Sequence, residues 1–473
     1  MRSVLADLIL VVLALALGFL LTTQVIPRAT LFLLRILGFN TQASPVTLKR
    51  IARFKRIRRG YWSFLALTTI FVTSLFLELL VNGRPLVIHY GDRTAFPAIA
   101  EWASKAVFFA DIAYFQRKSD FGQSGDDEVD YRRFALDAAH PELVKSRLDD
   151  DRKKLDEARA TLKAAQDHNA ELKAQGERVS VEDRMRVAAL KNDAEQLETE
   201  LAEREKTQGT FLSAHPWCVM PIYWYGPTDY RLDLPQSPPS NPSFACGAPL
   251  GTDEAGRDVL VLLLYGFRIS LAYALVVWAV GYSIGTVIGA LQGYFGSWTD
   301  IGLQRVEEIW SSIPYLYVIM IIASLVTPTF GKLVLLTVIL SSWLGITFYM
   351  RAEFYREKAK DYVQAAIGSG VSDFRIMTRH ILPNALVPIV TLSPFTIVGY
   401  VSSLVALDFL GFGLPPGTPS WGNLLEQGLE NVLFHPHLII APSVALVLTL
   451  FSLVLVGEAV REAFDPKVFS RLR

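Results

Sequence analysis

The stretch that decides the fold is Asp361-Tyr-Val-Gln-Ala-Ala-Ile-Gly-Ser-Gly370-Val-Ser-Asp-Phe-Arg-Ile-Met-Thr-Arg-His-Ile-Leu-Pro383-Asn. It is polar and charged, yet it lies between two strongly apolar runs near 333–350 and 386–407. Gly370 predicts the end of one short helix, and Ser372 predicts the cap of a second. Positive charge just before the stretch indicates that it faces the cytoplasm. The pattern predicts a helix–turn–helix on the membrane face, better suited to docking a protein than to chemistry; an ordinary amphipathic loop is the alternative.

The composition indicates a polytopic membrane protein with a sizeable soluble part. The chain has 473 residues, of which 51% are hydrophobic, and a formal net charge of zero, which is too apolar for a soluble protein of this size. Seven apolar runs reach, or nearly reach, the ~20 residues needed to cross a bilayer. They lie near 4–26, 61–81, 269–291, 309–327, 333–350, 386–407 and 438–457.

Several functions are excluded by what the sequence lacks. It has no basic–aromatic groove and no zinc-type cysteine spacing, so neither nucleic acid nor a metal ion is an expected partner. Gly331-Lys332 lacks the preceding glycine loop of a Walker A motif, so ATP hydrolysis by this chain is not expected, and no cofactor is predicted. Gly281-Tyr-Ser283-Ile-Gly285 formally matches a hydrolase nucleophile elbow, but it lies within an apolar helix and is rejected as a catalytic site.

The basic segment at 27–60 is the clearest orientation signal. It carries nine Lys and Arg residues and no acidic residue, which predicts a cytoplasmic location and affinity for anionic lipid. We read the run at 4–26 as a retained membrane anchor rather than a cleaved signal peptide, because no small-residue cleavage site follows it. The run at 61–81 then crosses outward, so residues 82–260 are expected outside the cytoplasm.

The outer segment contains a predicted coiled-coil hairpin at 141–206. One heptad-like series is formed by Leu148, Leu155 and Leu162, and a second appears after Gly176. Two such stripes joined by a short turn predict antiparallel helices at about 141–175 and 180–206. Either a self-contained hairpin or an arm that docks a partner fits this pattern.

Residues 215–249 are rich in proline and aromatic residues and predict an irregular collar. The only two cysteines, Cys218 and Cys246, both lie there. In an oxidising compartment they can form a disulfide, which stabilises by about 3 kcal/mol on loop-entropy scaling; two inert thiols are the alternative.

Two further patterns concern how the helices are built. Gly281, Gly285 and Gly289 recur every four residues, which predicts a flat ridge for close helix packing in lipid. The segment Leu250-Gly-Thr-Asp-Glu-Ala-Gly-Arg-Asp-Val-Leu260 predicts an internal salt-bridged turn rather than a metal site. Its key residues are Gly251, Thr252, Asp253, Gly256, Arg257 and Asp258.

The opening stretch resembles the EAA loop of ABC-importer permeases. The matching residues are Ala365, Ala366, Gly370, Leu382 and Pro383, whereas the leading Glu of the family is Gln364 here. The Arg379-His-Ile-Leu-Pro-Asn384 extension, the Gly251–Asp258 signature and the Gly/Pro-rich loop ending in Trp421-Gly resemble the dipeptide/oligopeptide branch. Segments 52–63 and 456–466 resemble permeases of the microcin C/oligopeptide importer type. The docking residues that the resemblance implies are Asp361, Gln364, Ala365, Ala366, Gly370, Ser372, Arg379, His380, Leu382 and Pro383.

The resemblance implies an all-α polytopic membrane protein with the ABC type I importer permease bundle. Six core helices, one extra N-terminal helix and a periplasmic insertion carrying the hairpin are expected. The implied partners are a sister permease, two ATP-binding subunits, a periplasmic substrate-binding protein and the lipid bilayer. The implied location is the bacterial inner membrane, multi-pass, with the C-terminus in the cytoplasm. A membrane-anchored interaction protein and a passive channel are the alternatives from other classes.

The expected organisation divides the chain into four parts. They are an extra N-terminal anchor at 1–45, a basic segment with the first core helix at 46–81, a periplasmic domain at 82–260, and a permease core at 261–473 with the loop at 351–385.

Overall fold

The computed structural model describes residues 4–36, 45–106, 117–121, 127–174 and 180–465. The predicted hairpin turn at Gly176 and the tail after 465 lie outside the described residues. The chain divides into two compact units, a helical unit of residues 1–77 with 227–473 and an insertion of Glu78–Gly226. The insertion therefore ends at Gly226 rather than at the predicted 260, because residues 227–260 pack with the helices.

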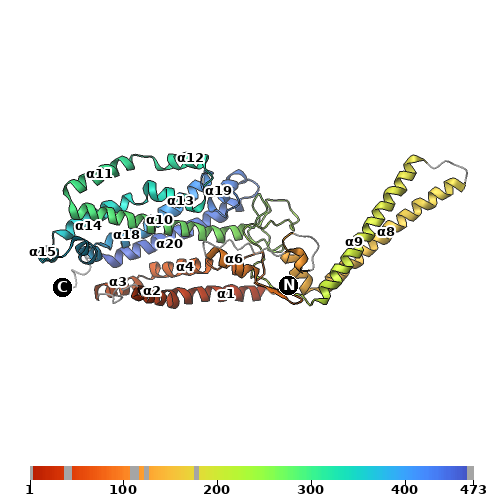
Figure 1. Ribbon diagram of the computed structural model, residues 1–473, viewed down its shortest axis with the longest axis horizontal. Helices are drawn as coiled ribbons and strands as arrows, with labels where there is room; N and C mark the ends of the chain where they lie inside the picture. Colours follow the sequence, from red (N-terminus) through yellow and green to blue (C-terminus); the bar gives the residue numbers. More distant parts are fainter. Residues whose placement is uncertain (1–3, 37–44, 107–116, 122–126, 175–179, 466–473) are drawn as a thin grey trace. The chain divides into compact units, whose positions relative to one another are not determined.

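The helical unit contains four long apolar helices and two bent pairs. The long helices are Ile9–Phe32, α10 (Val259–Phe295), α18 (Val387–Phe409) and α20 (His437–Phe464). The bent pairs are α11 (Ser297–Ser311) with α12 (Tyr315–Leu325), at 63°, and Phe330–Ser342 with α14 (Leu344–Lys358), at 46°. The described residues thus hold four candidate spans, or up to six if each pair is one span (Figure 1).

Two predicted runs differ from the helices observed. The run near 61–81 forms α4 (Arg58–Ser74), which has 17 residues, and α5 (Leu77–Leu80); α4 is shorter than the ~20 residues that span a bilayer. The N-terminal run continues past 26 through α1 (Val4–Leu20), a π-helical turn and α2 (Ile26–Ile36). Gly18 of α1 faces α4 so closely that a Cβ there would overlap the Thr73 side chain.

The centre of the helical unit is an apolar core shared by α4, α10, α18 and α20. Its buried residues include Leu67, Phe267, Val401 and Leu453, and Trp421 of α19 (Trp421–Glu430) closes one end. α18 runs unbroken through Pro394. Two shorter elements complete this unit, the basic α3 (Pro45–Arg56) and α13 (Phe330–Thr337), which continues into the π-helix η3 (Val338–Ser342).

The insertion has a small antiparallel sheet of order β2-β1-β3. Its strands are β1 (Val87–Tyr90), β2 (Arg93–Ala95) and β3 (Trp217–Val219), and β3 is a regular element inside the segment predicted to be wholly irregular. α6 (Pro97–Ala106), η2 (Lys118–Phe121) and α7 (Tyr131–Ala139) accompany the sheet. Ile88, Phe134 and Phe211 form its buried core.

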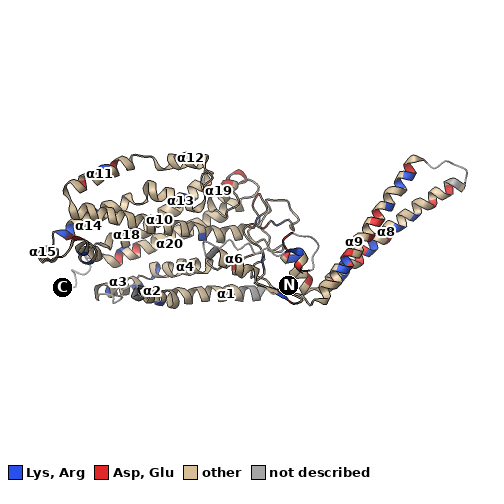
Figure 2. Ribbon diagram, viewed as in Figure 1, with Lys and Arg blue, Asp and Glu red and all other residues tan. Residues whose placement is uncertain are grey.

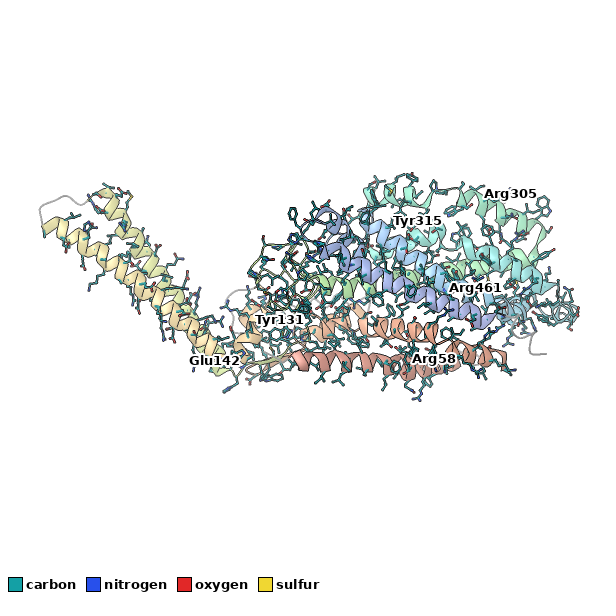
Figure 3. The ribbon with its side chains drawn as sticks, turned by 180° about the vertical axis from the view of Figure 1, so that it is seen from behind. Arg58, Tyr131, Glu142, Arg305, Tyr315 and Arg461 are labelled. Atoms are coloured by element: carbon teal, nitrogen blue, oxygen red, sulfur yellow. The ribbon has the colours of Figure 1, made fainter. Side chains whose placement is uncertain are left out.

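Two long antiparallel helices, α8 (Pro141–Ala174) and α9 (Val181–Ser213), extend from this base. Tyr131 of α7 and Glu142 of α8 lie at the base (Figure 3). α9 ends seven residues beyond the predicted 206 because Phe211 continues its apolar face into the base, where its ring lies 5.2 Å from that of Phe134. Charged residues of both signs line the two helices (Figure 2).

Candidate functional site

The predicted helix–turn–helix is present and begins at the end of α14. α15 (Asp361–Gly368) ends in a Schellman motif: Gly370 N–H donates to the Ile367 carbonyl at 3.0 Å and Val371 N–H to the Ala366 carbonyl at 3.2 Å. Gly370 has φ +75°, the left-handed conformation that this motif requires and that a side chain disfavours. No atom lies within 4 Å of a Cβ at this position, so the backbone alone selects glycine.

The second half of the loop contains three short helical pieces, α16 (Asp373–Arg375), the π-helix η4 (Ile376–Ile381) and α17 (Leu382–Ala385). Ser372 precedes α16 as predicted, but its side chain makes no capping hydrogen bond. The adjacent Asp373 instead accepts a 2.5 Å hydrogen bond from the Tyr294 hydroxyl. This contact fastens the loop to the end of α10.

Tyr294 also binds the end of α14. Lys358 Nζ donates to the Tyr294 carbonyl at 2.5 Å, and the ammonium lies 5.0 Å from the centre of the Tyr294 ring. One tyrosine thereby joins three segments that are separated in sequence, namely the ends of α10 and α14 and the start of α16. The base of the loop is fixed by these polar contacts.

A second polar cluster surrounds Glu357, whose side chain is only 2% exposed. Its carboxylate accepts hydrogen bonds from Lys360 Nζ at 2.6 Å and from the Tyr362 hydroxyl at 2.7 Å. Asn384 donates to the same hydroxyl at 3.1 Å and so links α15 to α17. Burial and the hydrogen bond to Glu357 raise the pKa of Tyr362, so this phenol remains a neutral donor to the carboxylate.

Beneath these contacts the loop has an apolar anchor. Val363, Ile376 and Ile381 are fully buried against Met350 and Phe354 of α14. Two other apolar side chains of the loop are exposed, Ile367 at 40% and Phe374 at 77%. The loop therefore presents exposed apolar side chains on a firmly held base.

The other predicted docking residues have different environments. Asp361, Ala365, Arg379 and Pro383 are exposed, whereas Ala366, His380 and Leu382 are half-buried. Gln364 Nε2 donates to the Lys358 carbonyl at 2.7 Å.

The glycine ridge of α10 faces η3 and α14. A Cβ on Gly281 would overlap Ser342, and a Cβ on Gly285 would overlap Ile346. A Cβ on Gly289 would lie 2.5 Å from the Thr347 carbonyl oxygen, and one on Gly293 would overlap the Arg351 carbonyl oxygen. The absence of side chains lets α10 approach η3 and α14 closely along about three helical turns, directly before the loop.

The Gly251–Asp258 signature forms a buried charged turn at the start of α10. Asp253 holds Arg257 with contacts of 2.6–2.8 Å, and both carboxylates, Asp253 and Asp258, have 0% exposed surface. Asp258 caps α10 through the Leu260 N–H at 2.9 Å and pairs with Arg231 at 3.3 Å.

The remaining signature residues hold this turn in place. Thr252 is hydrogen-bonded to Ser240 at 2.9 Å. Gly251 and Gly256 have φ of +73° and +84°, which favours glycine.

The two cysteines are both free, Cys218 half-buried and Cys246 exposed. Burial raises the pKa of the Cys218 thiol to about 11, so it is protonated at neutral pH. The two residues belong to different compact units, and the disulfide stays a prediction.

Sequence reasoning missed the residues that fix the loop from outside it. Tyr294 and Glu357 lie outside the stretch from Asp361 to Asn384, and no local pattern marks them as partners of Asp373 and Tyr362. Arg351, which holds Asp300 of α11 through contacts of 2.6 and 2.7 Å, was also missed as an ion-pair residue. Phe374 was assigned only to a short helix; its high exposure was not foreseen.

Comparison with known proteins defines the class of this helical membrane protein. Residues 285–470 match the family described as binding-protein-dependent transport system inner membrane component. This span includes the glycine ridge from Gly285 onward, the whole loop and α20. This part of the chain is thus similar to inner-membrane components of binding-protein-dependent transport systems.

Relatives that match nearly the whole chain identify the family more specifically. The peptidoglycan transport system permease protein YejE of Agrobacterium fabrum is 34% identical over 447 residues, covering 90% of this chain and 94% of the relative. The inner membrane ABC transporter permease protein YejE of Escherichia coli is 33% identical, covering 90% and 98%. The chain therefore belongs to the YejE family of permeases: it is the permease subunit of an ABC peptide-type importer and a multi-pass inner-membrane protein.

More distant proteins match part of the chain. The oligopeptide transport system permease protein OppC of Haemophilus influenzae is 33% identical over 260 residues, covering 54% of this chain and 80% of that protein. A structure of the inward-facing MetNI methionine ABC transporter aligns with 43% of this chain and 97% of its own, at 16% identity and a TM-score of 0.33. That similarity is too low to support an argument.

Proposed function

We propose that this permease moves peptides or peptide-like compounds across the inner membrane and is driven through the 361–383 loop by separate ATPase subunits. The observation that carries the proposal is the exposure of two apolar side chains on the loop surface, Ile367 and Phe374. A large aromatic side chain that is 77% exposed is unfavourable in water and is suited to a pocket on a partner. The contacts of Tyr294 and Glu357 hold that surface in one conformation, which lowers the entropy cost of binding.

Docking at this loop explains how the chain does transport work without an ATP site of its own. A displacement of the loop is transmitted to α14 through Lys358 and to α10 through Tyr294. We propose the ABC type I arrangement of six core helices with α1–α2 as the extra helix. A sister permease, two ATP-binding subunits and a periplasmic substrate-binding protein complete the assembly. The loop, residues 27–60 and the C-terminus then face the cytoplasm.

The cargo class follows from the relatives. The two YejE proteins cover nearly the whole chain, and one is named for peptidoglycan transport, whereas OppC is named for oligopeptide transport. The two names that state a cargo support a peptide-containing compound, and the proposal includes a microcin C-like one. Selectivity is assigned largely to the binding protein.

The test is a Phe374→Ala variant compared with Phe244→Ala, a matched control in which the lost phenylalanine is 87% exposed outside the loop. Removing a buried aromatic anchor from an interface costs about 2 kcal/mol, so we expect binding of the co-purifying ATPase subunits to fall roughly 30-fold. Peptide uptake should fall with it, while the control stays near wild type.

Equal binding by the Phe374→Ala and wild-type chains would contradict docking at this surface. A Gly370→Trp variant provides a second measurement, because a side chain at φ +75° strains the turn although its Cβ would meet no neighbour within 4 Å. It should insert into the membrane and lose coupling of ATP hydrolysis to uptake. A reporter fused after Pro383 should give a cytoplasmic signal, and an outside signal would overturn the proposed orientation.

A further inference from the structure

A groove of about 890 Å³ lies between the first turns of α18 and the last turns of α20. It begins directly after the loop, because α17 ends at Ala385 and Val387, the first residue of α18, lines the groove. Its volume is within the range of about 300–1,000 Å³ that is common for ligand sites. The groove is therefore large enough to hold a short peptide segment.

The wall that α18 contributes is mostly apolar. Val387, Leu392 and Phe395 line it. The hydroxyl of Thr391, which also lines it, already donates to the Val387 carbonyl at 2.9 Å. This wall therefore suits apolar side chains.

The wall that α20 contributes is charged and has an excess of negative charge. Its charged residues recur three or four positions apart, so they lie on one face of the helix: Glu458, Arg461, Glu462 and Asp465. Glu458, Arg461 and Glu462 are exposed, and none of them forms an ion pair with another described residue. Three carboxylates beside one guanidinium suit an occupant with positive charge.

The chain itself leaves α20 at this groove. α20 ends at Phe464, and Asp465 has an extended backbone with φ −64° and ψ 117°. Pro466 follows, and a residue before proline is disfavoured in a helix. The segment after Asp465 therefore starts at the groove without continuing the helix.

The sequence of that segment matches both walls. Residues 466–473, which follow the described part of the chain, contain Lys467, Arg471 and Arg473 and no acidic residue. Side chains of an extended chain alternate between two sides. The three basic residues would share one side, and Val468 and Leu472 the other.

The segment is also long enough to turn back along α20. An extended chain covers about 3.3 Å per residue, so 466–473 can reach about 26 Å. The charged face from Glu458 to Asp465 rises only about 10 Å along the helix.

We propose that residues 466–473 bind in this groove, with their basic side chains on the carboxylates of α20 and Val468 and Leu472 on the wall of α18. A segment of another protein would need the same combination of positive charge and apolar side chains. This segment has it and is covalently held at the groove, which gives it a high effective concentration there. Once bound, it joins the end of α20 to the first turns of α18, directly after the loop.

The experiment measures amide hydrogen exchange of the purified full-length permease in a neutral detergent, without lipid or other subunits. A Glu458→Gln/Glu462→Gln variant is compared with Glu426→Gln/Glu430→Gln, which removes the same charge from exposed positions of α19. We expect exchange at residues 468–472 to be slow in the wild type and at least fivefold faster in the groove variant. The α19 variant should change it less than twofold.

A charge exchange identifies the occupant. Glu458→Lys/Glu462→Lys should release the segment, so exchange at 468–472 should again be at least fivefold faster. Adding Lys467→Glu/Arg471→Glu to the same chain should bring exchange back to within twofold of the wild type, because the attraction is restored with its signs reversed.

Four results would each overturn the proposal. They are wild-type exchange at 468–472 as fast as in an unstructured peptide, equal effects of the groove and α19 variants, and no recovery in the charge exchange. The fourth is protection that appears only after ATPase subunits are added, which would assign the groove to those subunits instead.

Discussion

Gln364 lies where the related EAA loop carries a glutamate, and its environment explains the difference. Its Nε2 donates to the Lys358 carbonyl at 2.7 Å, at the end of α14 where a helix leaves carbonyls without partners. A carboxylate cannot donate and would face that carbonyl as a second acceptor. The amide therefore serves the loop's own structure, and a role on a partner need not be assigned to it.

Gln364→Glu should loosen the link between α14 and α15. The position is exposed, so water compensates in part, and a loss near the lower end for a hydrogen bond, about 0.5–1 kcal/mol, is expected. Faster amide exchange at residues 361–366 and a two- to fivefold fall in ATPase binding should follow. Gln364→Ala is the control, because it removes the hydrogen bond without adding an acceptor and should be milder. Tighter ATPase binding by the Gln364→Glu variant would show that the ATPase subunit contacts this position directly.

Residue identities were predictable where the chemistry is local. Gly370 could be assigned because the turn that ends a helix at a glycine is formed by the backbone of neighbouring residues alone. Ser372 occupies the predicted N-cap position, but its side chain makes no capping hydrogen bond. The hydrogen bond that holds this turn is instead made by Asp373 with Tyr294, 79 positions away in sequence. The residues that hold the loop are set by tertiary contacts that no short pattern encodes.

At the scale of elements, the glycine ridge and the hairpin show the same contrast between what the local sequence predicts and what tertiary contacts decide. The four-residue glycine spacing predicts a flat face, but the sequence does not name α14 as the helix that uses it. The heptads of the hairpin identify the inward residues: Leu155 and Ala194 are buried and Leu162 is half-buried. The end of α9 was misjudged because Phe211 belongs to the core of the base.

The polar residues that interrupt the heptads are bonded across the hairpin. Asp151 accepts from Arg204 at 2.7 Å, and Asn169 donates to the Asp183 carbonyl at 3.4 Å. The hydrogen bond from Arg204 is the largest cause of the lowered pKa of Asp151. With a lowered folded pKa, the stabilisation is complete above the unfolded value near 3.9 and is lost as the pH falls through the folded value.

Amide protection of α8 and α9 should therefore be flat near neutral pH and should decrease below about pH 4. Asp151→Asn should lower the amide protection at pH 7 by the free energy of an exposed ion pair, about 0.5 kcal/mol. In this variant the further decrease of protection below about pH 4 should be absent. Lys153→Gln is the control, since its partner Asp150 is on the same helix. A mutant whose acid response equals that of the wild type would rule out Asp151 as the titrating group.

At the scale of the whole molecule, the sequence predicted the class of protein more accurately than the boundaries of its compact units. Apolar runs, basic bias and the loop motif are enough for a polytopic permease, because each reflects the bilayer or a partner directly. The end of the insertion was placed at 260, yet residues 227–260 pack with the helical unit, for example through Glu254, which is hydrogen-bonded to Gln427 and Asn431. Proline-rich segments carry no periodicity, so the compact unit with which they pack can be identified only from the fold.

The hairpin is expected to be dispensable for assembly of the pore. Its core along most of its length consists of leucines and alanines that bury little area, and its ion pairs Arg152–Glu205 and Arg159–Glu198 are internal to it. Its anchorage lies at the base, where Val144 and Phe211 are 1% and 5% exposed. Removing residues 150–206 keeps both anchors and leaves two neighbouring helices about 10 Å apart. A Gly/Ser bridge of about six residues can close that gap.

The shortened chain should assemble with its ATPase subunits as the wild type does and should keep their hydrolysis of ATP. Uptake supplied by the binding protein then distinguishes the two uses of the hairpin. Reduced uptake with normal hydrolysis would establish an arm that docks a partner, and unchanged uptake would establish a self-contained hairpin. Loss of the assembled complex would refute both, because it would mean that α8 and α9 support the helical unit in a way their internal contacts do not reveal.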